Sequence, residues 1–192
     1  MRLARLVQRF LMAAVAAVLP FCCGCSQGET PQPPSGKTMQ TIELKTSAFA
    51  QGETIPKQYT GDGKNGSPPL SWSAAPDETK SWAIICDDPD APAGTWVHWV
   101  IFNLPADTRE LPEHVPTDEQ LTGGAIQGKN DFGDIGYDGP APPKGKPHRY
   151  FFKLYALDAP LTLKPGATKA ELLKAMDGHV LGHGELMGKY QR

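Results

Sequence analysis

The chain has few cysteines and distributes them unevenly. Three of the four stand at positions 22, 23 and 25, and Cys86 is the only one that follows. A single cysteine cannot form a disulfide within residues 26–192, so no disulfide framework is expected there. Cys86 ends the apolar run that begins at Ala83, and we interpret it as a small buried hydrophobic residue, not as a nucleophile.

The chain also lacks an excess of positive charge. Lys and Arg number 19 against 21 Asp and Glu, a formal net charge of -2 over 192 residues. Three of the basic residues, Arg2, Arg5 and Arg9, lie at the N-terminus, and without them 16 basic residues face 21 acidic ones. A nucleic-acid-binding domain needs a basic patch or stripe, so no nucleic-acid partner is expected. The length and the 40% hydrophobic content fit one globular domain.

No hydrophobic run is long enough to cross a membrane. The longest, Phe10 to Phe21, falls short of the roughly 20 residues that a bilayer requires. It follows the three arginines and precedes small residues, which is typical of a secretory signal peptide. We therefore predict a signal peptide over residues 1–25, a disordered polar tether over 26–38 and a folded domain over 39–192.

The end of this leader resembles a bacterial lipobox. Cys25 follows Gly24, the small residue that precedes the lipidated cysteine in such motifs. We expect Cys25 to be lipidated and the domain to be exported and anchored in the bacterial cell envelope, at the periplasmic face or in the outer membrane.

The domain is poor in helical patterns and rich in turn residues, with 19 prolines and 20 glycines. Apolar, aromatic and β-branched runs predict strands at residues 42–45, 82–86, 96–104 and 150–157. One helix is predicted from Thr168, which forms a capping box with Glu171, to Gly178. Its apolar face comprises Leu172, Leu173 and Met176. Residues 105–147 show almost no regular pattern, and a connection of that length is usually functional or disordered.

Polar side chains occur at the ends of three predicted strands. By alternation, Asp88 shares a face with Ile84 and Cys86, and His98 shares a face with Trp96, Val100 and Phe102. His148 and Tyr150 share a face with Phe152 and Leu154. If these faces meet in one core, the four polar groups converge at the mouth of one small-ligand pocket.

The sequence offers little support for an enzyme. The Gly-x-Ser-x-Gly elbow of a hydrolase is missing, and no glutamate lies between His179 and His183 to form a zinc-protease motif. Asp88, His98 and His148 could still ligate a divalent metal that activates water, so a metal-dependent hydrolase remains the less favoured alternative. We predict no catalytic residue, no metal site and no cofactor.

Two further segments carry a family resemblance. Residues 88–92 (DPDAP) followed by 96–99 (WVHW), and residues 139–145 (GPAPPKG) followed by 148–150 (HRY), resemble the two signatures of the phosphatidylethanolamine-binding (Raf kinase inhibitor-like) family. Residues 59–63 (YTGDG), 67–72 (SPPLSW) and 178–181 (GHVL) extend the likeness over nearly the whole domain in the same order. The short bacterial and archaeal branch is the most similar.

The resemblance implies an all-β core of two antiparallel sheets, a Greek-key β-sandwich with a few short peripheral helices. It also implies a pocket for phosphate-like anions or phospholipid headgroups. Carried over by position, the ligand-binding residues are Asp88, His98, Pro142, Pro143, His148 and Tyr150. The supporting residues are Asp90, Pro92 and Arg149, with Asp90 and Arg149 as a buried pair that braces a loop.

The family name leaves a protein-interaction function open. A cytoplasmic kinase is an improbable target for an exported lipoprotein, whereas an envelope protease or another protein partner is an alternative. In that case residues 105–147, and not the pocket, would carry the activity.

Overall fold

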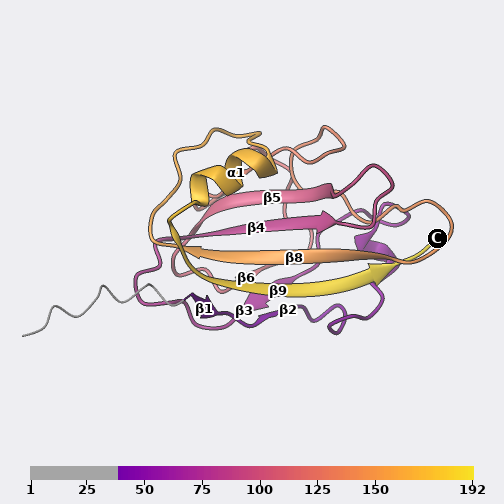
Figure 1. Ribbon diagram of the computed structural model, residues 1–192, viewed down its shortest axis with the longest axis horizontal. Coiled ribbons are helices and arrows are strands. Elements are labelled where there is room, and N and C mark those ends of the chain that lie inside the picture. The colour runs from indigo at the N-terminus through magenta and orange to yellow at the C-terminus, as the bar shows by residue number, and fades with distance from the viewer. Residues whose placement is uncertain (1–38) are drawn as a thin grey trace, which may run out of the picture. The chain divides into compact units, whose positions relative to one another are not determined.

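The computed structural model describes residues 39–192 (Figure 1). The expected signal peptide, Cys25 and the tether lie outside the described residues. Eleven elements follow in order: β1 (Gln40–Thr41), β2 (Leu44–Lys45), the 3-10 helix η1 (Lys57–Tyr59), β3 (Leu70–Trp72), β4 (Ser81–Asp88), β5 (Trp96–Pro105), β6 (Glu110–Leu111), β7 (Ile126–Gln127), β8 (His148–Leu157), α1 (Lys169–Met176) and β9 (Val180–Tyr190).

The strands form two sheets, a larger one in the order β1-β9-β8-β4-β5-β7 and a smaller one in the order β2-β3-β6. The prediction of a mostly β domain with two sheets and little helix is confirmed. One pairing differs from the expected antiparallel pattern, because β1 runs parallel to β9. A parallel neighbour requires a long connection between the strands, and nearly the whole domain lies between β1 and β9.

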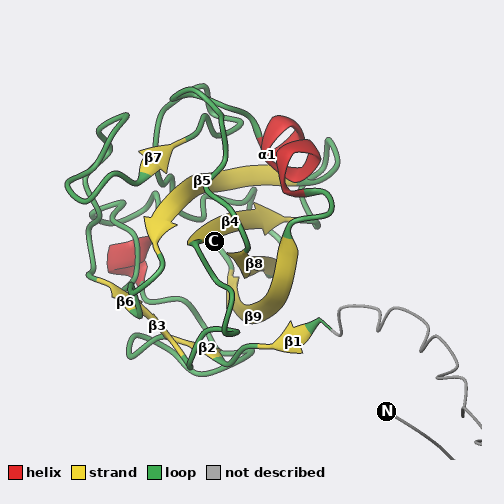
Figure 2. Ribbon diagram, turned by 90° about the vertical axis from the view of Figure 1, so that its left-hand side faces the viewer, coloured by secondary structure: helices red, strands yellow, loops and turns green. Residues whose placement is uncertain are grey.

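The larger sheet is covered on both faces (Figure 2). On one face, Ile84 and Phe152 belong to the hydrophobic cluster shared with the smaller sheet. On the other face, Ile85 packs in a second cluster with Leu172 of α1. This two-sided burial explains why β4 is buried at all eight positions and why its residues 82–86 form a continuous apolar run.

A β-bulge near the start of β5 changes the predicted side-chain pattern. Cys86 pairs with Trp99, but the next residue, Asp87, pairs with Val97, so His98 is the extra residue. The prediction that His98 shares a face with Val100 and Phe102 is therefore wrong. Those two side chains pack on the α1 side of the sheet, whereas the bulge leaves His98 on the opposite side, where it lines a cavity.

The longest strand, β9, was not predicted from the sequence. Its glycines hide the alternation, and they are required by close approach of other segments. A Cβ on Gly182 would lie 2.7 Å from the carbonyl oxygen of Gln40, and one on Gly188 would lie 2.5 Å from Ile55 Cγ1.

The helix α1 confirms the predicted capping box. Thr168 Oγ1 accepts a hydrogen bond from the Glu171 backbone N–H, and the Glu171 carboxylate accepts one from the Thr168 backbone N–H. The predicted apolar face is wrong at one position: Leu172 and Met176 are buried, but Leu173 is 41% exposed. Within residues 39–192, no helix is long and apolar enough to cross a bilayer.

Residues 106–147 contain little regular structure, as predicted, yet they are tied to the sheet. Gln127 is fully buried, and its side-chain oxygen accepts a hydrogen bond from the indole N–H of Trp99 at 2.8 Å. Its side-chain N–H group donates to the carbonyl oxygens of Pro116 and Asp118. These bonds fix the connection against β5, and the far end of the same connection supplies one wall of the cavity described next.

Candidate functional site

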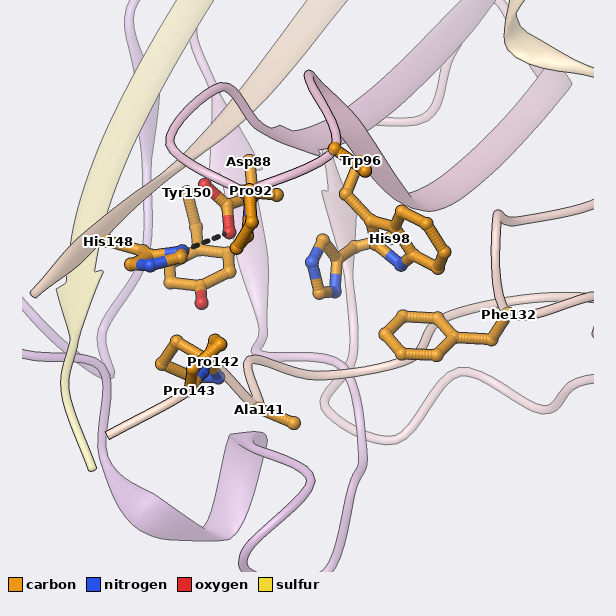
Figure 3. Close-up of a pocket in the computed structure, with 12 residues that line it drawn as sticks. Asp88, Pro92, Trp96, His98, Phe132, Ala141, Pro142, Pro143, His148 and Tyr150 are labelled. Carbon is orange, nitrogen blue, oxygen red and sulfur yellow. Dashed lines mark hydrogen bonds and ion pairs between the residues drawn. The ribbon is translucent and has the colours of Figure 1, made fainter. Parts of the chain in front are cut away.

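A cavity of about 230 Å³ opens where β4 ends and where β5 and β8 begin (Figure 3). In Figure 1 this end of the larger sheet lies near the C-terminus. Strand ends and loops both contribute to it. The lining residues are Asp88, Ala91, Pro92, Ala93, Trp96, His98, Phe132, Ala141, Pro142, Pro143, His148 and Tyr150.

The six predicted ligand-binding residues all line this one cavity, and so does Pro92. Figure 3 shows Asp88, His148 and Tyr150 on one side and His98 on the other. Phe132 was not predicted, because it comes from the irregular connection and carries no recognisable signal. Trp96, which was expected to share a face with His98, also forms part of the cavity wall.

His148 is held by a carboxylate. Its Nδ1 lies 2.7 Å from Asp88 Oδ2, and both side chains are largely buried. Asp88 Oδ1 accepts a hydrogen bond from the backbone N–H of Asp90 at 2.8 Å, which fixes the carboxylate. A carboxylate only accepts, so Nδ1 carries a proton and Nε2 is left for the cavity. The two side chains thus form a rigid unit that joins β4 to β8.

His98 is held by the backbone. Its Nδ1 lies 2.6 Å from the carbonyl oxygen of Asp138, so this nitrogen also carries a proton. Burial lowers the pKa of His98 below its usual value of 6.5, partly opposed by the hydrogen bond to Asp138 and by the charge of Asp88. His98 is therefore neutral at neutral pH, with Nε2 as an acceptor.

Tyr150 completes the polar side of the cavity. Burial, together with the nearby Asp88 charge, raises the pKa of its phenol well above the usual value. The hydroxyl group therefore stays protonated and can donate a hydrogen bond.

Aromatic rings form the opposite wall. Phe132 is 45% exposed at the cavity mouth and meets the rings of Trp96 and His98 edge to face, at centroid distances of 5.4 and 5.3 Å. The remaining wall is made of alanine and proline side chains. A few polar groups on an otherwise apolar surface are the usual anatomy of a small-ligand site.

The proline wall is braced by the C-terminus. Arg192 makes a bidentate ion pair with Asp62 and donates to the carbonyl oxygen of Ala141 at 3.1 Å. The backbone N–H of Gly61 donates to Pro140 O at 2.9 Å. The YTGDG segment recognised in the sequence therefore supports the loop that carries Pro142.

Asp90 and Arg149 brace the other rim, outside the cavity. The backbone N–H and the guanidinium of Arg149 both donate to the Asp90 carboxylate, at 2.7 to 3.0 Å. The predicted pairing is present, but the prediction that it is buried is wrong, since Arg149 is 49% and Asp90 is 29% exposed.

We expect this ion pair to make a small, pH-dependent contribution to stability. Arg149 lowers the pKa of Asp90 from 3.8 to about 2, so the contribution is present above pH 3.8 and is lost as the pH falls through about 2. Because the pair is partly exposed, Asp90→Asn should cost only about 1 kcal/mol at neutral pH. Thermal melts of both proteins between pH 2 and 7 test this. A difference that persists unchanged at the lowest pH would contradict it.

In the part of the chain that the structure describes, no group of three His, Cys, Asp or Glu side chains is placed to hold a metal ion. His179 instead pairs with Asp158, at 2.7 Å, and His183 lies on β9.

Comparisons with known proteins identify the family of this chain. The sequence profile described as phosphatidylethanolamine-binding protein matches residues 45–191. A UPF0098 protein of Methanothermobacter thermautotrophicus is 57% identical over 151 residues, which are 79% of this chain and 99% of the relative. A UPF0098 protein of Pyrococcus horikoshii is 51% identical over 157 residues, 80% of this chain and 79% of the relative.

Solved structures give the same result. A Chlamydia trachomatis protein described as a homologue of phosphatidylethanolamine-binding protein superposes with a TM-score of 0.73 at 43% identity, over 80% of this chain and 99% of that one. An Escherichia coli protein described as a new member of the mammalian family has a TM-score of 0.73 at 33% identity, over 79% and 98%. The chain therefore belongs to the phosphatidylethanolamine-binding protein family, as its two signature segments predicted.

Proposed function

We propose that this protein binds a small phosphate-like anion in the cavity and does not catalyse a reaction on it. The observation that carries the proposal is the convergence of His98, His148 and Tyr150, whose Nε2 atoms and hydroxyl group line one small cavity. Its lining residues include none of the nucleophiles Ser, Thr, Cys and Lys, and the Asp88 carboxylate is already engaged by His148 and by the Asp90 backbone N–H.

Protons are central to how such a site would hold an anion. In the empty cavity Asp88 is negative, while His98 is neutral and presents a lone pair at Nε2. A fully ionised anion would be repelled by this arrangement. Either the ligand brings a proton, as a monoprotonated phosphate does, or an imidazole takes one up and becomes a charged donor.

The direct test is calorimetric titration of the purified protein with orthophosphate and phosphoethanolamine, beside the double variant His98→Ala, His148→Ala. We expect saturable binding that weakens by about a hundredfold in the variant, since two charge-assisted hydrogen bonds are lost. The variant His179→Ala, His183→Ala is the matched control, because these histidines lie away from the cavity. Equal affinity in wild type and the His98, His148 variant would exclude the cavity as the site.

The affinity should rise as the pH falls. Burial lowers the pKa of His98 in the empty cavity, and a bound anion raises it, so binding takes up a proton between those two pKa values. Sulfate is a useful probe, since it does not titrate in this range and its pH profile reports the protein alone. We expect sulfate to bind several-fold more tightly at about pH 5.5 than at pH 8, and His98→Gln to flatten the profile. A flat profile in the wild type would contradict the protonation scheme.

The cellular setting is a separate proposal. The lipobox-like segment supports export and lipidation at Cys25, which would hold the cavity at the cell envelope. Mass spectrometry of the membrane fraction tests this: the expected product begins at Cys25 with acyl chains attached, and Cys25→Ala should release the protein from the membrane. An unmodified wild-type Cys25 would refute lipidation.

A further inference from the structure

A second concave surface adjoins the cavity at the start of β8. This basic groove, of about 510 Å³, is lined by Asp90, Lys146, Pro147, His148, Arg149 and Lys189. It contains three cationic side chains and one carboxylate, an excess of two positive charges on a chain with a net charge of -2. Outside this groove the chain therefore carries a net negative charge, so the positive charge of the groove is a local feature.

Of the three cations of the groove, Arg149 is paired with Asp90, and the two lysines are not neutralised by the described residues. Arg149 and Lys189 are directly opposite each other on β8 and β9, an arrangement of like charges that destabilises a sheet. Asp90 engages only Arg149, through Nε and Nη2. Among the described residues, neither Lys146 nor Lys189 has a carboxylate partner, although other lysines such as Lys153 do. A bound anion would relieve the repulsion between Arg149 and Lys189.

The groove and the cavity share one residue, His148. His148 and Arg149 are consecutive in β8 and so point to opposite faces of the sheet. The two sites therefore lie on either side of the start of the strand, next to the exposed Pro147. A ligand that occupies both must pass around this strand end, which a single phosphate cannot do.

We infer that the basic groove is a second anionic subsite, and that the ligand of this protein carries at least two phosphate groups. One phosphate enters the cavity between His98 and His148, and the next lies in the groove against Lys146 and Lys189. The inference rests on the proposed anion-binding function, and it names the ligand class as a linear polyphosphate or a compound with phosphates spaced along a short chain.

Calorimetry with ortho-, pyro-, tripoly- and tetrapolyphosphate, at constant ionic strength in metal-free buffer, tests the inference on the purified protein. We expect affinity to increase with chain length and to reach at least about tenfold over orthophosphate once the chain spans both sites. The variant Lys146→Ala, Lys189→Ala should lose this gain while keeping its orthophosphate affinity within about twofold. Both side chains are exposed, and the backbone hydrogen bonds of Lys189 do not depend on its side chain.

The matched control removes the same charge elsewhere. Lys164→Ala, Lys174→Ala changes two exposed lysines that line neither site, and it should preserve the gain with chain length. An equal loss in both double variants would show a general charge effect and overturn the subsite, as would a wild type with no gain at any length. Failure of orthophosphate itself to bind would instead refute the proposed function.

Discussion

Replacing Asp87 by alanine is expected to destabilise the domain by about 3–5 kcal/mol. The carboxylate is 1% exposed and contacts two ammonium groups, that of Lys153 on β8, at 2.9 Å, and that of Lys169 at the start of α1. It thus joins two strands of the larger sheet to the helix that covers it. Without Asp87, two lysines that are less than a third exposed would lose their shared counter-ion, and uncompensated buried charge is among the most costly defects in a protein.

Urea denaturation followed by circular dichroism measures the effect. Asp90→Asn is the comparison, because it removes the carboxylate of a more exposed ion pair and should cost only about 1 kcal/mol. The triple variant Asp87→Leu, Lys153→Met, Lys169→Met should recover most of the loss, since it removes all three charges together. If Asp87→Ala cost no more than Asp90→Asn, the buried triad would have no special role in stability.

The sequence predicted the parts of the fold that rest on local pattern. β4, β5 and β8 have apolar and aromatic runs, and α1 has its capping box, so each was located to within a few residues. β9 escaped prediction because glycines replace the side chains that would have revealed its alternation. Their cause is tertiary, the close approach of residues 40–55 to this strand, and local pattern does not contain it.

The site residues also divide into those that local pattern predicted and those that depend on tertiary contacts. From the polar residues at the strand ends, Asp88, His148 and Tyr150 were correctly predicted to line one cavity. This prediction was correct because β8 alternates without interruption in this region. His98 was correctly expected at the cavity, although the residues predicted to share its face were wrong. The error arose because the bulge opposite Asp87 depends on how β5 pairs with β4 and cannot be recognised in the sequence of β5. Phe132 comes from an irregular loop, whose path follows from hydrogen bonds such as that of Gln127 to Trp99 and not from sequence periodicity.

Gly139→Ala should disrupt the cavity from behind its proline wall. A Cβ at this position would lie 2.5 Å from the carbonyl oxygen of Tyr59 and 2.7 Å from Thr60 Cα, both rigid backbone atoms. The backbone N–H of Gly139 also donates to Asn65 Oδ1 at 2.7 Å, so the segment is held on this side as well. Relief of the clash requires the loop that carries Pro142 to move away from residues 59–60, and overpacking of this kind costs about 1–3 kcal/mol.

The loss of phosphate affinity should exceed what a loss of stability alone would cause. Pro142 belongs to the same loop and lines the cavity, so a shift of this backbone would change the space between the proline wall and His148. We expect phosphate affinity to fall at least about tenfold in Gly139→Ala, measured by calorimetry well below the melting temperature. Gly61→Ala is the graded control, because its Cβ would lie 3.1 Å from the side chain of Ala141 and can be accommodated by a small shift. If Gly139→Ala binds phosphate with the same affinity as the wild type, the proline wall does not contact the anion. The histidine side of the site would then bind it alone.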